Sequence, residues 1–111
     1  MPYFLCRLSP PRPTFFADMT PDEGELMRAH RAYWRPLVET GTVIAIGAVA
    51  DPAGAWGVAI VEAGSAAAVK ALQARDPVVV ADRGFAYATY AMPTIAVRPA
   101  EPRAAVSSVT P

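Results

Sequence analysis

Hydrophobic residues follow two different spacings along this chain, and together the spacings predict an α+β fold. Short β-branched or aromatic runs typical of strands occupy residues 3–8, 42–49, 56–63 and 85–97. Apolar residues recur at helical spacing in residues 21–40 and 66–75. The order strand, helix, strand, strand, helix, strand predicts a ferredoxin-like βαββαβ fold, in which one antiparallel sheet carries two helices on one face.

The first predicted helix has clear start and stop signals. Thr20 is placed to cap it, Pro21 takes the first helical position, and Glu23 completes a capping box. Gly41 is a typical residue just beyond a helix end. Pro36 lies inside the segment and is expected to kink it.

A proline-rich segment, residues 9–19, separates the first strand from this helix. Its prolines remove backbone donors and fix φ, so we expect a long irregular connection there. The segment carries Phe15 and Phe16, and it would serve either as a lid over a site or as an ordinary packed surface loop. Residues 76–84 are a second break, with room for one helical turn.

The predicted strands are apolar on both faces, although helices in this fold cover only one face. In the first strand, Phe4, Cys6 and Leu8 alternate with Tyr3, Leu5 and Arg7. In the second, Val43, Ala45 and Gly47 alternate with Ile44, Ile46 and Ala48. An uncovered apolar face implies a partner, and the simplest is a second copy packed sheet to sheet as a homodimer.

Composition narrows the class of protein. At 111 residues and 53% hydrophobic, the chain suits one domain, which we expect over residues 1–99 with a mobile tail over residues 100–111. Lys+Arg and Asp+Glu balance at 10 each, which gives no case for binding nucleic acid or an anionic membrane. A single cysteine, the absence of a signal-peptide pattern and the absence of a spanning apolar run favour a cytoplasmic protein.

The only histidine, His30, lies on the inward stripe of the first helix, in register with Leu26, Tyr33 and Leu37. The opposite side carries Arg28, Arg31, Arg35 and Glu39. A buried imidazole needs a hydrogen-bond partner, because an unpaired polar group costs about 1–3 kcal/mol. Either His30 is a core residue satisfied by a backbone carbonyl or a water, or it has a side-chain partner and acts as an acid or base.

Asp76 is the best-placed partner for His30. It follows the second helix directly and Pro77 restricts the chain there, while both helices lie side by side in this fold. A carboxylate accepting from His30 Nδ1–H would hold the ring in one tautomer. The alternative is that Asp76 is a turn former ahead of a proline. Three other aspartates are less well placed: Asp18, Asp51 and Asp82.

The chain resembles the YCII-related proteins from about residue 1 to residue 98. The marks of the resemblance are the histidine in "LMRAHRAYW", the strand pair "TVIAIGAVADPAGAWGVAIVE" and "ARDP" after the second helix. It implies a ferredoxin-like fold that forms a dimeric α+β barrel, and a His–Asp dyad at His30 and Asp76. Activities associated with this fold include a dehydrochlorinase of a chlorinated hydroxyquinol and muconolactone isomerase, which implies lyase or isomerase chemistry.

Five further residues are candidates for substrate binding. Tyr33 and Trp34 follow His30 by one helical turn, and Trp56 opens the third strand, so we expect Trp34, Trp56 and the proline-rich segment to rim a cavity. Gly47 would let a ligand approach the backbone, and Arg7 would anchor a carboxylate or phenolate. The alternatives are core or dimer contacts for the aromatic residues, a bulge at the glycine and a surface position for the arginine.

Two functions fit these residues. The first is a cofactor-independent enzyme of the lyase or isomerase type, in which His30 moves a proton of a small aromatic or cyclic hydroxy or oxo compound and Asp76 orients it. No cofactor is expected, since the sequence has no P-loop or dinucleotide-binding motif, and one Cys and one His give no Cys/His metal cluster. The alternative is a non-catalytic module that binds a small molecule.

Overall fold

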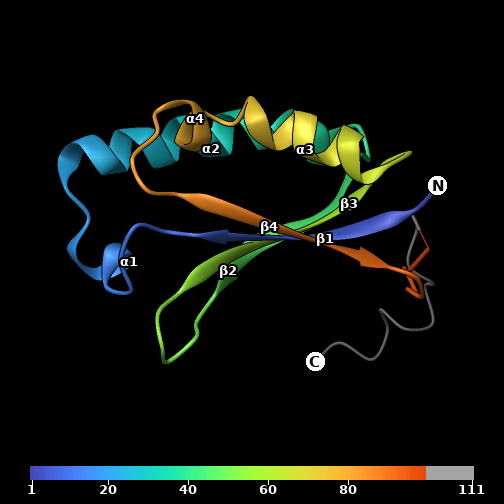
Figure 1. The fold of residues 1–111 in the computed structure, drawn as a ribbon, viewed down its shortest axis with the longest axis horizontal. Helices are drawn as coiled ribbons and strands as arrows, with labels where there is room; N and C mark the ends of the chain where they lie inside the picture. Colours follow the sequence, from blue (N-terminus) through green and yellow to red (C-terminus); the bar gives the residue numbers. More distant parts are fainter. Residues whose placement is uncertain (100–111) are drawn as a thin grey trace, which may run out of the picture.

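The computed structural model describes residues 1–99 and contains one four-stranded sheet. In chain order its elements are β1 (Tyr3–Ser9), α1 (Phe15–Asp18), α2 (Pro21–Glu39), β2 (Val43–Val49), β3 (Trp56–Glu62), α3 (Ala66–Ala74), α4 (Pro77–Val80) and β4 (Ala86–Met92). The strand order is β2-β3-β1-β4, and all three pairings are antiparallel. Helices α2, α3 and α4 lie across one face (Figure 1). This arrangement confirms the ferredoxin-like prediction; the expected tail over residues 100–111 lies outside the described residues.

Helix α2 has the predicted ends. The Thr20 hydroxyl accepts from the Glu23 N–H at 3.2 Å, and the Glu23 carboxylate accepts from the Thr20 N–H at 2.9 Å, so both halves of the capping box are present. Gly41 follows the helix with φ of +91°, which an L side chain rarely adopts. Pro36 lies within α2 and does not end it.

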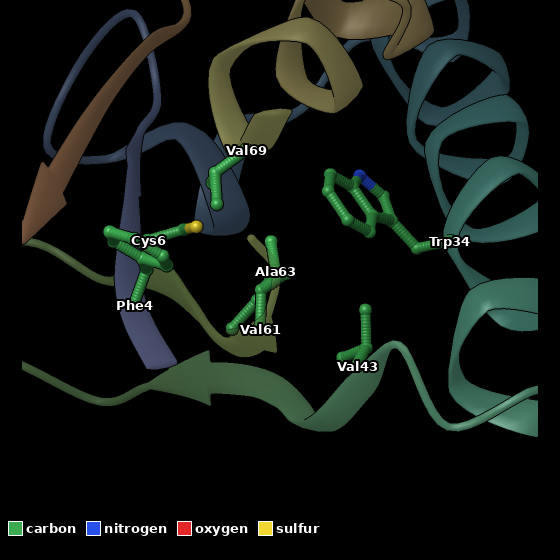
Figure 2. Packing of buried hydrophobic residues seen from close by; sticks show 8 residues of the cluster. Phe4, Cys6, Trp34, Val43, Val61, Ala63 and Val69 are labelled. Atoms are coloured by element: carbon green, nitrogen blue, oxygen red, sulfur yellow. The ribbon is translucent and has the colours of Figure 1, made fainter. Parts of the chain in front are cut away.

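The main core forms where α2 and α3 cover the sheet. Its buried members come from β1, α2, β2, β3 with the residue that follows it, and α3: Phe4, Cys6, Trp34, Val43, Ala59, Val61, Ala63 and Val69. Trp34 is only 1% exposed, and its indole points from α2 toward Val69 and Val43 (Figure 2). The large side chain therefore fixes the distance between α2 and the sheet.

A β-bulge changes which residues of β2 face the helices. Val43 pairs with Val61, but Ala45 already pairs with Ile60, so Ile44 is an extra residue in the strand. The predicted alternation that placed Val43 and Ala45 on one face is therefore wrong. Beyond the bulge every side chain is turned to the face opposite the predicted one, because strand side chains alternate with a period of two.

Two predicted boundaries are also wrong. The last strand ends at Met92 instead of reaching residue 97, since Pro93 has no N–H to continue the ladder. The proline-rich segment is not wholly irregular, because α1 forms one turn within it. Prolines at positions 10, 11 and 13 all precede this turn, so no N–H needed by α1 is missing.

An arginine clamp attaches the proline-rich segment to α2. The Arg12 guanidinium donates to both carboxylate oxygens of Glu23 at 2.8 Å and to Asp18 Oδ1 at 2.8 Å, and it lies over the Phe15 ring. The Arg12 side chain, followed by the Thr20 N–H, lowers the pKa of Glu23 to about 2. Its charged form therefore stabilises the fold above its unfolded-state pKa of about 4.3, and this contribution is lost as the pH falls toward 2.

Two glycines let the same segment lie close to the rest of the chain. A Cβ built on Gly54, in the β2–β3 turn, would approach Pro13 Cβ to 2.9 Å. A Cβ on Gly84, just before β4, would approach Pro11 Cβ to 2.9 Å. Both glycines also have positive φ, so side chains are disfavoured there by backbone geometry and by space.

The sheet face opposite the helices is apolar and is covered by no other element within residues 1–99. Leu5 of β1 pairs with Ile60 of β3 and Tyr90 of β4, so these three side chains share this outer face. Val58 and Ala88, the partners of Arg7, lie beside them. Tyr90 lies on the edge strand β4 and is 55% exposed, so a large aromatic side chain on this face is open to solvent.

Replacing Arg12 with alanine is expected to release the proline-rich segment from α2, because both ion pairs and the contact with Phe15 are lost. Amide hydrogen exchange of residues 14–18 should become faster, while exchange in α3 stays unchanged. Arg28→Ala is the matched control, since Arg28 pairs only with the exposed Glu25 on the same helix. Unchanged exchange in Arg12→Ala would mean that the contacts with the two glycines hold the segment without the clamp.

Candidate active site

His30 and Asp76 are brought together by helix packing. His30 lies between Met27 and Trp34 on the buried stripe of α2, and Asp76 is the N-cap of α4, which packs on α2. His30 Nδ1 lies 2.8 Å from Asp76 Oδ2. The Asp76 side chain is fully buried and the His30 side chain is 11% exposed. The predicted hydrogen bond between these residues is confirmed.

Asp76 accepts from three further donors. The Trp34 Nε1–H and the Tyr87 hydroxyl donate to the same Oδ2, at 2.7 Å and 2.6 Å. The Val78 N–H donates to Oδ1 at 3.1 Å and begins α4. Both carboxylate oxygens are thus hydrogen-bonded, and the carboxylate connects α2, α4 and β4. The alternative interpretation of Asp76 as a turn former is also correct locally, because it caps α4.

These contacts fix the charge of the carboxylate. Burial acts to raise the pKa of Asp76, but the hydrogen bonds from His30, Trp34 and Tyr87 outweigh it, and the pKa lies below its usual value. Burial, and then the neighbouring Asp76, raise the pKa of Tyr87, so its hydroxyl stays protonated and donates. Since an ionised carboxylate only accepts, the hydrogen of the bond belongs to His30 Nδ1, and a neutral ring has its lone pair on Nε2.

A cavity of about 430 Å³ opens beside the His30 ring. One wall is α2, the facing wall comes from β1, β2 and β3, and the proline-rich segment contributes Pro10 and Phe16. The full lining is Leu8, Pro10, Phe16, Met27, His30, Arg31, Trp34, Arg35, Val38, Glu39, Ile46, Gly47, Ala48, Gly57 and Phe85. No hydrogen bond to His30 Nε2 is found within residues 1–99. Nε2 is therefore the ring nitrogen left for a ligand.

Of the predicted substrate-binding residues, Trp34 and Gly47 line this cavity. Trp34 is nearly all buried and donates to Asp76, so it supports the dyad more than it contacts the open space. A Cβ at Gly47 would meet nothing within 4 Å, so the glycine is not required by crowding. The predicted use of the proline-rich segment as part of the rim is confirmed by Phe16.

Trp56 and Arg7 do not line the cavity, and the expectation that Trp56 forms its rim is wrong. Ala59 and Val61 of β3 face the helices, so strand alternation turns Trp56 to the outer face. There the Arg7 guanidinium stacks 4.3 Å from the Trp56 ring centroid, and the Trp56 Nε1–H donates to Asp51 at 3.1 Å. The two residues form their own cluster on the outer face.

Tyr33 is also absent from the cavity lining. Its hydroxyl donates to the Leu72 carbonyl at 2.7 Å, which joins α2 to α3. Its ring packs edge-on against Trp34 with centroids 5.2 Å apart. One turn of helix places Tyr33 beside Trp34 but on the α3 side, so its role in this structure is support of the helix pair.

Several residues that line the cavity or bind Asp76 are not among the predicted site residues. Helical spacing predicts Arg31 and Arg35 on the solvent side of α2; both are exposed, and both also line the cavity mouth. Ile46 reaches the cavity because the bulge turned β2 over. Tyr87 was not singled out, although its pairing with the buried Leu8 would have placed it on the helix side of the sheet.

Within the described part of the chain, no group of three or more His, Cys, Asp or Glu side chains is arranged to hold a metal ion. In the same part, none of the helices combines the length and the apolar character needed to cross a membrane.

The chain matches the YCII-related domain over residues 3–92, which is most of its length. It therefore belongs to the YCII-related family, and the resemblance noted in the sequence is confirmed. No curated protein matches the sequence.

Asp76→Asn should be strongly destabilising although it changes no volume. Whichever way the amide is turned, its NH2 group faces a hydrogen-bond donor, either the three at Oδ2 or the Val78 N–H. A buried donor without an acceptor costs about 1–3 kcal/mol, so urea unfolding should show a loss of at least about 2 kcal/mol. Tyr87→Phe removes one donor only, and a loss of about 1 kcal/mol is expected.

The native protein and Asp76→Asn should also differ in their response to acid. Because the folded-state pKa of Asp76 is depressed, its ionisation stabilises the fold above the unfolded-state pKa of about 3.9, and this is lost as pH falls through the folded-state value. The amide of the variant does not titrate, so the stability difference between the two proteins should shrink below about pH 4. A constant difference from about pH 7 to about pH 3 would contradict an ionised Asp76.

Proposed function

We propose that the protein is an enzyme of the lyase or isomerase type that needs no cofactor, with His30 as the general base and Asp76 as the residue that orients it. One observation carries the proposal: a buried, ionised carboxylate holds Nδ1 of His30 while the same ring borders a cavity. A structural histidine has no need of an adjacent cavity, and a general base requires one.

In the proposed reaction Nε2 takes a proton from a carbon or hydroxyl of the substrate, and the ring becomes an imidazolium. In an elimination, the electron pair left on carbon forms a double bond, a leaving group departs with its own pair, and the imidazolium gives its proton to water. In an isomerisation, the imidazolium returns the proton to another carbon. Asp76 stabilises the imidazolium in both cases, and a base positioned this way contributes about 10²–10⁴-fold in rate.

The cavity favours a small aromatic or cyclic substrate. Its volume of about 430 Å³ lies at the lower end of the usual range for ligand sites, which starts near about 300 Å³. Phe16, Phe85 and Ile46 offer apolar contacts on the sides away from α2. A flat hydroxy or oxo compound of one or two rings would fill this space, with its reacting atom at His30.

The second candidate is a module that binds a small molecule without turnover. The other bonds of Asp76 favour it, because the carboxylate caps α4 and satisfies Trp34 and Tyr87 whether or not His30 takes a proton. On this view the imidazole only hydrogen-bonds the polar end of the ligand. The two candidates differ in one measurable respect, which is whether a proton of the ligand is exchanged.

We also propose that two copies of the chain pack sheet to sheet as a homodimer, forming a dimeric α+β barrel. The support is the outer face of Leu5, Val58, Ile60, Ala88 and Tyr90, which is apolar in a sheet covered by helices on the other side only (Figure 1). Burial of such a face is favourable by roughly 25 cal/mol per Å² of apolar surface.

His30→Gln should abolish proton exchange on a substrate while leaving the protein folded. The measurement is deuterium incorporation from D2O into a panel of aromatic and cyclic hydroxy and oxo compounds, followed by proton NMR. Tyr33→Phe is the matched control, because it removes one α2 hydrogen bond away from the cavity and should keep the activity. Two outcomes would favour the binding module. Either the His30→Gln variant exchanges protons as fast as the native protein, or the native protein binds compounds of the panel but exchanges a proton of none of them.

Tyr90→Glu should convert the dimer to a monomer, because it places a charge on the outer face beside Leu5. Light scattering coupled to size exclusion at micromolar concentration should give twice the mass of one chain for the native protein. Val80→Glu is the control, since Val80 is 69% exposed on α4, on the helix side. A native protein that elutes as a monomer would overturn the proposed dimer.

A further inference from the structure

The charged residues of the cavity are concentrated on one wall. Besides His30, the side chains in the lining that can carry charge are Arg31, Arg35 and Glu39, and all three belong to α2. The facing wall, from Leu8, Ile46 to Ala48 and Gly57, offers no charged side chain. A ligand in this cavity would therefore meet an apolar surface on one side and cationic groups on the other.

The two arginines are available to a ligand. Within residues 1–99 neither forms an ion pair, whereas Arg12 and Arg28 both do. Arg31 and Arg35 are four residues apart, so they project from the same side of α2 about 6 Å from each other. Glu39 lies one turn beyond Arg35 and makes no ion pair with it, which leaves both guanidinium groups free of a carboxylate in the described structure.

The buried carboxylate determines where an anion can bind in the cavity. Asp76 is ionised next to His30, so a negative group placed at the imidazole would be repelled by it in a site of low dielectric constant. Arg35 lies five residues beyond His30, about 7.5 Å along the helix axis. Repulsion at one end and attraction at the other give an anionic ligand a single favourable orientation.

We propose that Arg31 and Arg35 bind the anionic group of the ligand, so that the ligand class is a small aromatic or cyclic acid. Its carboxylate lies against the two guanidinium groups, its ring contacts Phe16 and Ile46, and its other end reaches His30. The planar guanidinium matches a carboxylate with paired hydrogen bonds. The assignment of the far end as the reacting end rests on the proposed function; the anion site itself does not.

The test compares two probes of the same shape, 4-hydroxybenzoate and its neutral analogue 4-hydroxybenzamide. Affinity is measured by titration calorimetry, and the site is read from the indole N–H signals of the two tryptophans in ¹⁵N NMR spectra. Trp34 lines the cavity and Trp56 lies on the opposite sheet face, so binding in the cavity shifts the first signal and leaves the second. The native protein should bind the acid about tenfold or more tightly than the amide, a difference that high salt reduces.

The double variant R31Q/R35Q should bind the acid and the amide equally and keep the affinity of the native protein for the amide. Arg28→Gln is the control on the same helix, outside the cavity, and should keep the preference for the acid. Three results would overturn the proposal: equal binding of both probes by the native protein, a preference that survives in the double variant, or no shift of the Trp34 signal with either probe at millimolar concentration.

The proposed function and the anion site can be tested separately. His30→Gln keeps both arginines, so it should keep the preference for the acid even though it loses proton exchange. If no compound is exchanged but the acid preference depends on Arg31 and Arg35, the enzyme proposal fails and the anion site stands. If exchange depends on His30 but the acid preference is absent, the anion site fails and the enzyme proposal stands.

Discussion

The arrangement of this domain depends on one buried charge. Asp76 is fully buried, and a carboxylate removed from water costs several kcal/mol unless its oxygens are hydrogen-bonded. Four donors meet that requirement, and they come from α2, α4 and β4. Moving any of these elements away would leave either the charge or a donor unsatisfied. The relative position of α2, α4 and β4 is therefore fixed by this polar cluster together with the packing of the hydrophobic core.

The same cluster determines which nitrogen of His30 is left for a ligand. Trp34 and Tyr87 donate to the same carboxylate as His30, so replacing Asp76 would leave their donors unsatisfied and destabilise the fold. The contact that sets the tautomer of His30 is therefore also needed for stability. Asp76 therefore has a structural role and also belongs to the candidate site. The two roles are separable by experiment, because Tyr87→Phe removes a donor of the cluster and keeps His30, whereas His30→Gln removes the imidazole and keeps the donors from Trp34, Tyr87 and Val78.

The fold could be predicted because it depends on local patterns with a fixed period. The pairing of His30 with Asp76 joins residues 46 positions apart, and the resemblance to the YCII-related proteins favoured it over the alternatives that the pattern left open. Helical spacing put His30 inward, a capping box and Gly41 set the ends of α2, and Pro77 placed Asp76 after the second helix. Predictions failed where the geometry depends on pairing between distant segments. One extra residue, Ile44, reversed the faces of β2. The outward position of Trp56 followed from strand alternation, but the sequence did not show which face the helices cover. Arg31 and Arg35 were predicted to face solvent, because helical spacing shows the direction in which a side chain points but does not show that a cavity lies there.

The proline-rich segment makes the site dependent on distant parts of the chain. Pro13 and Pro11 rest on Gly54 and Gly84, residues that lie about 40 and 70 positions later in the sequence. Contacts of such long range carry a chain-entropy cost that is recovered only when the intervening elements are in place. During synthesis, Phe16 cannot take its place at the cavity, and His30 cannot meet its partner, until the C-terminal third of the domain has left the ribosome. A chain that ends before Asp76 therefore lacks the partner of His30, and one that ends before Gly84 lacks a contact that holds the proline-rich segment.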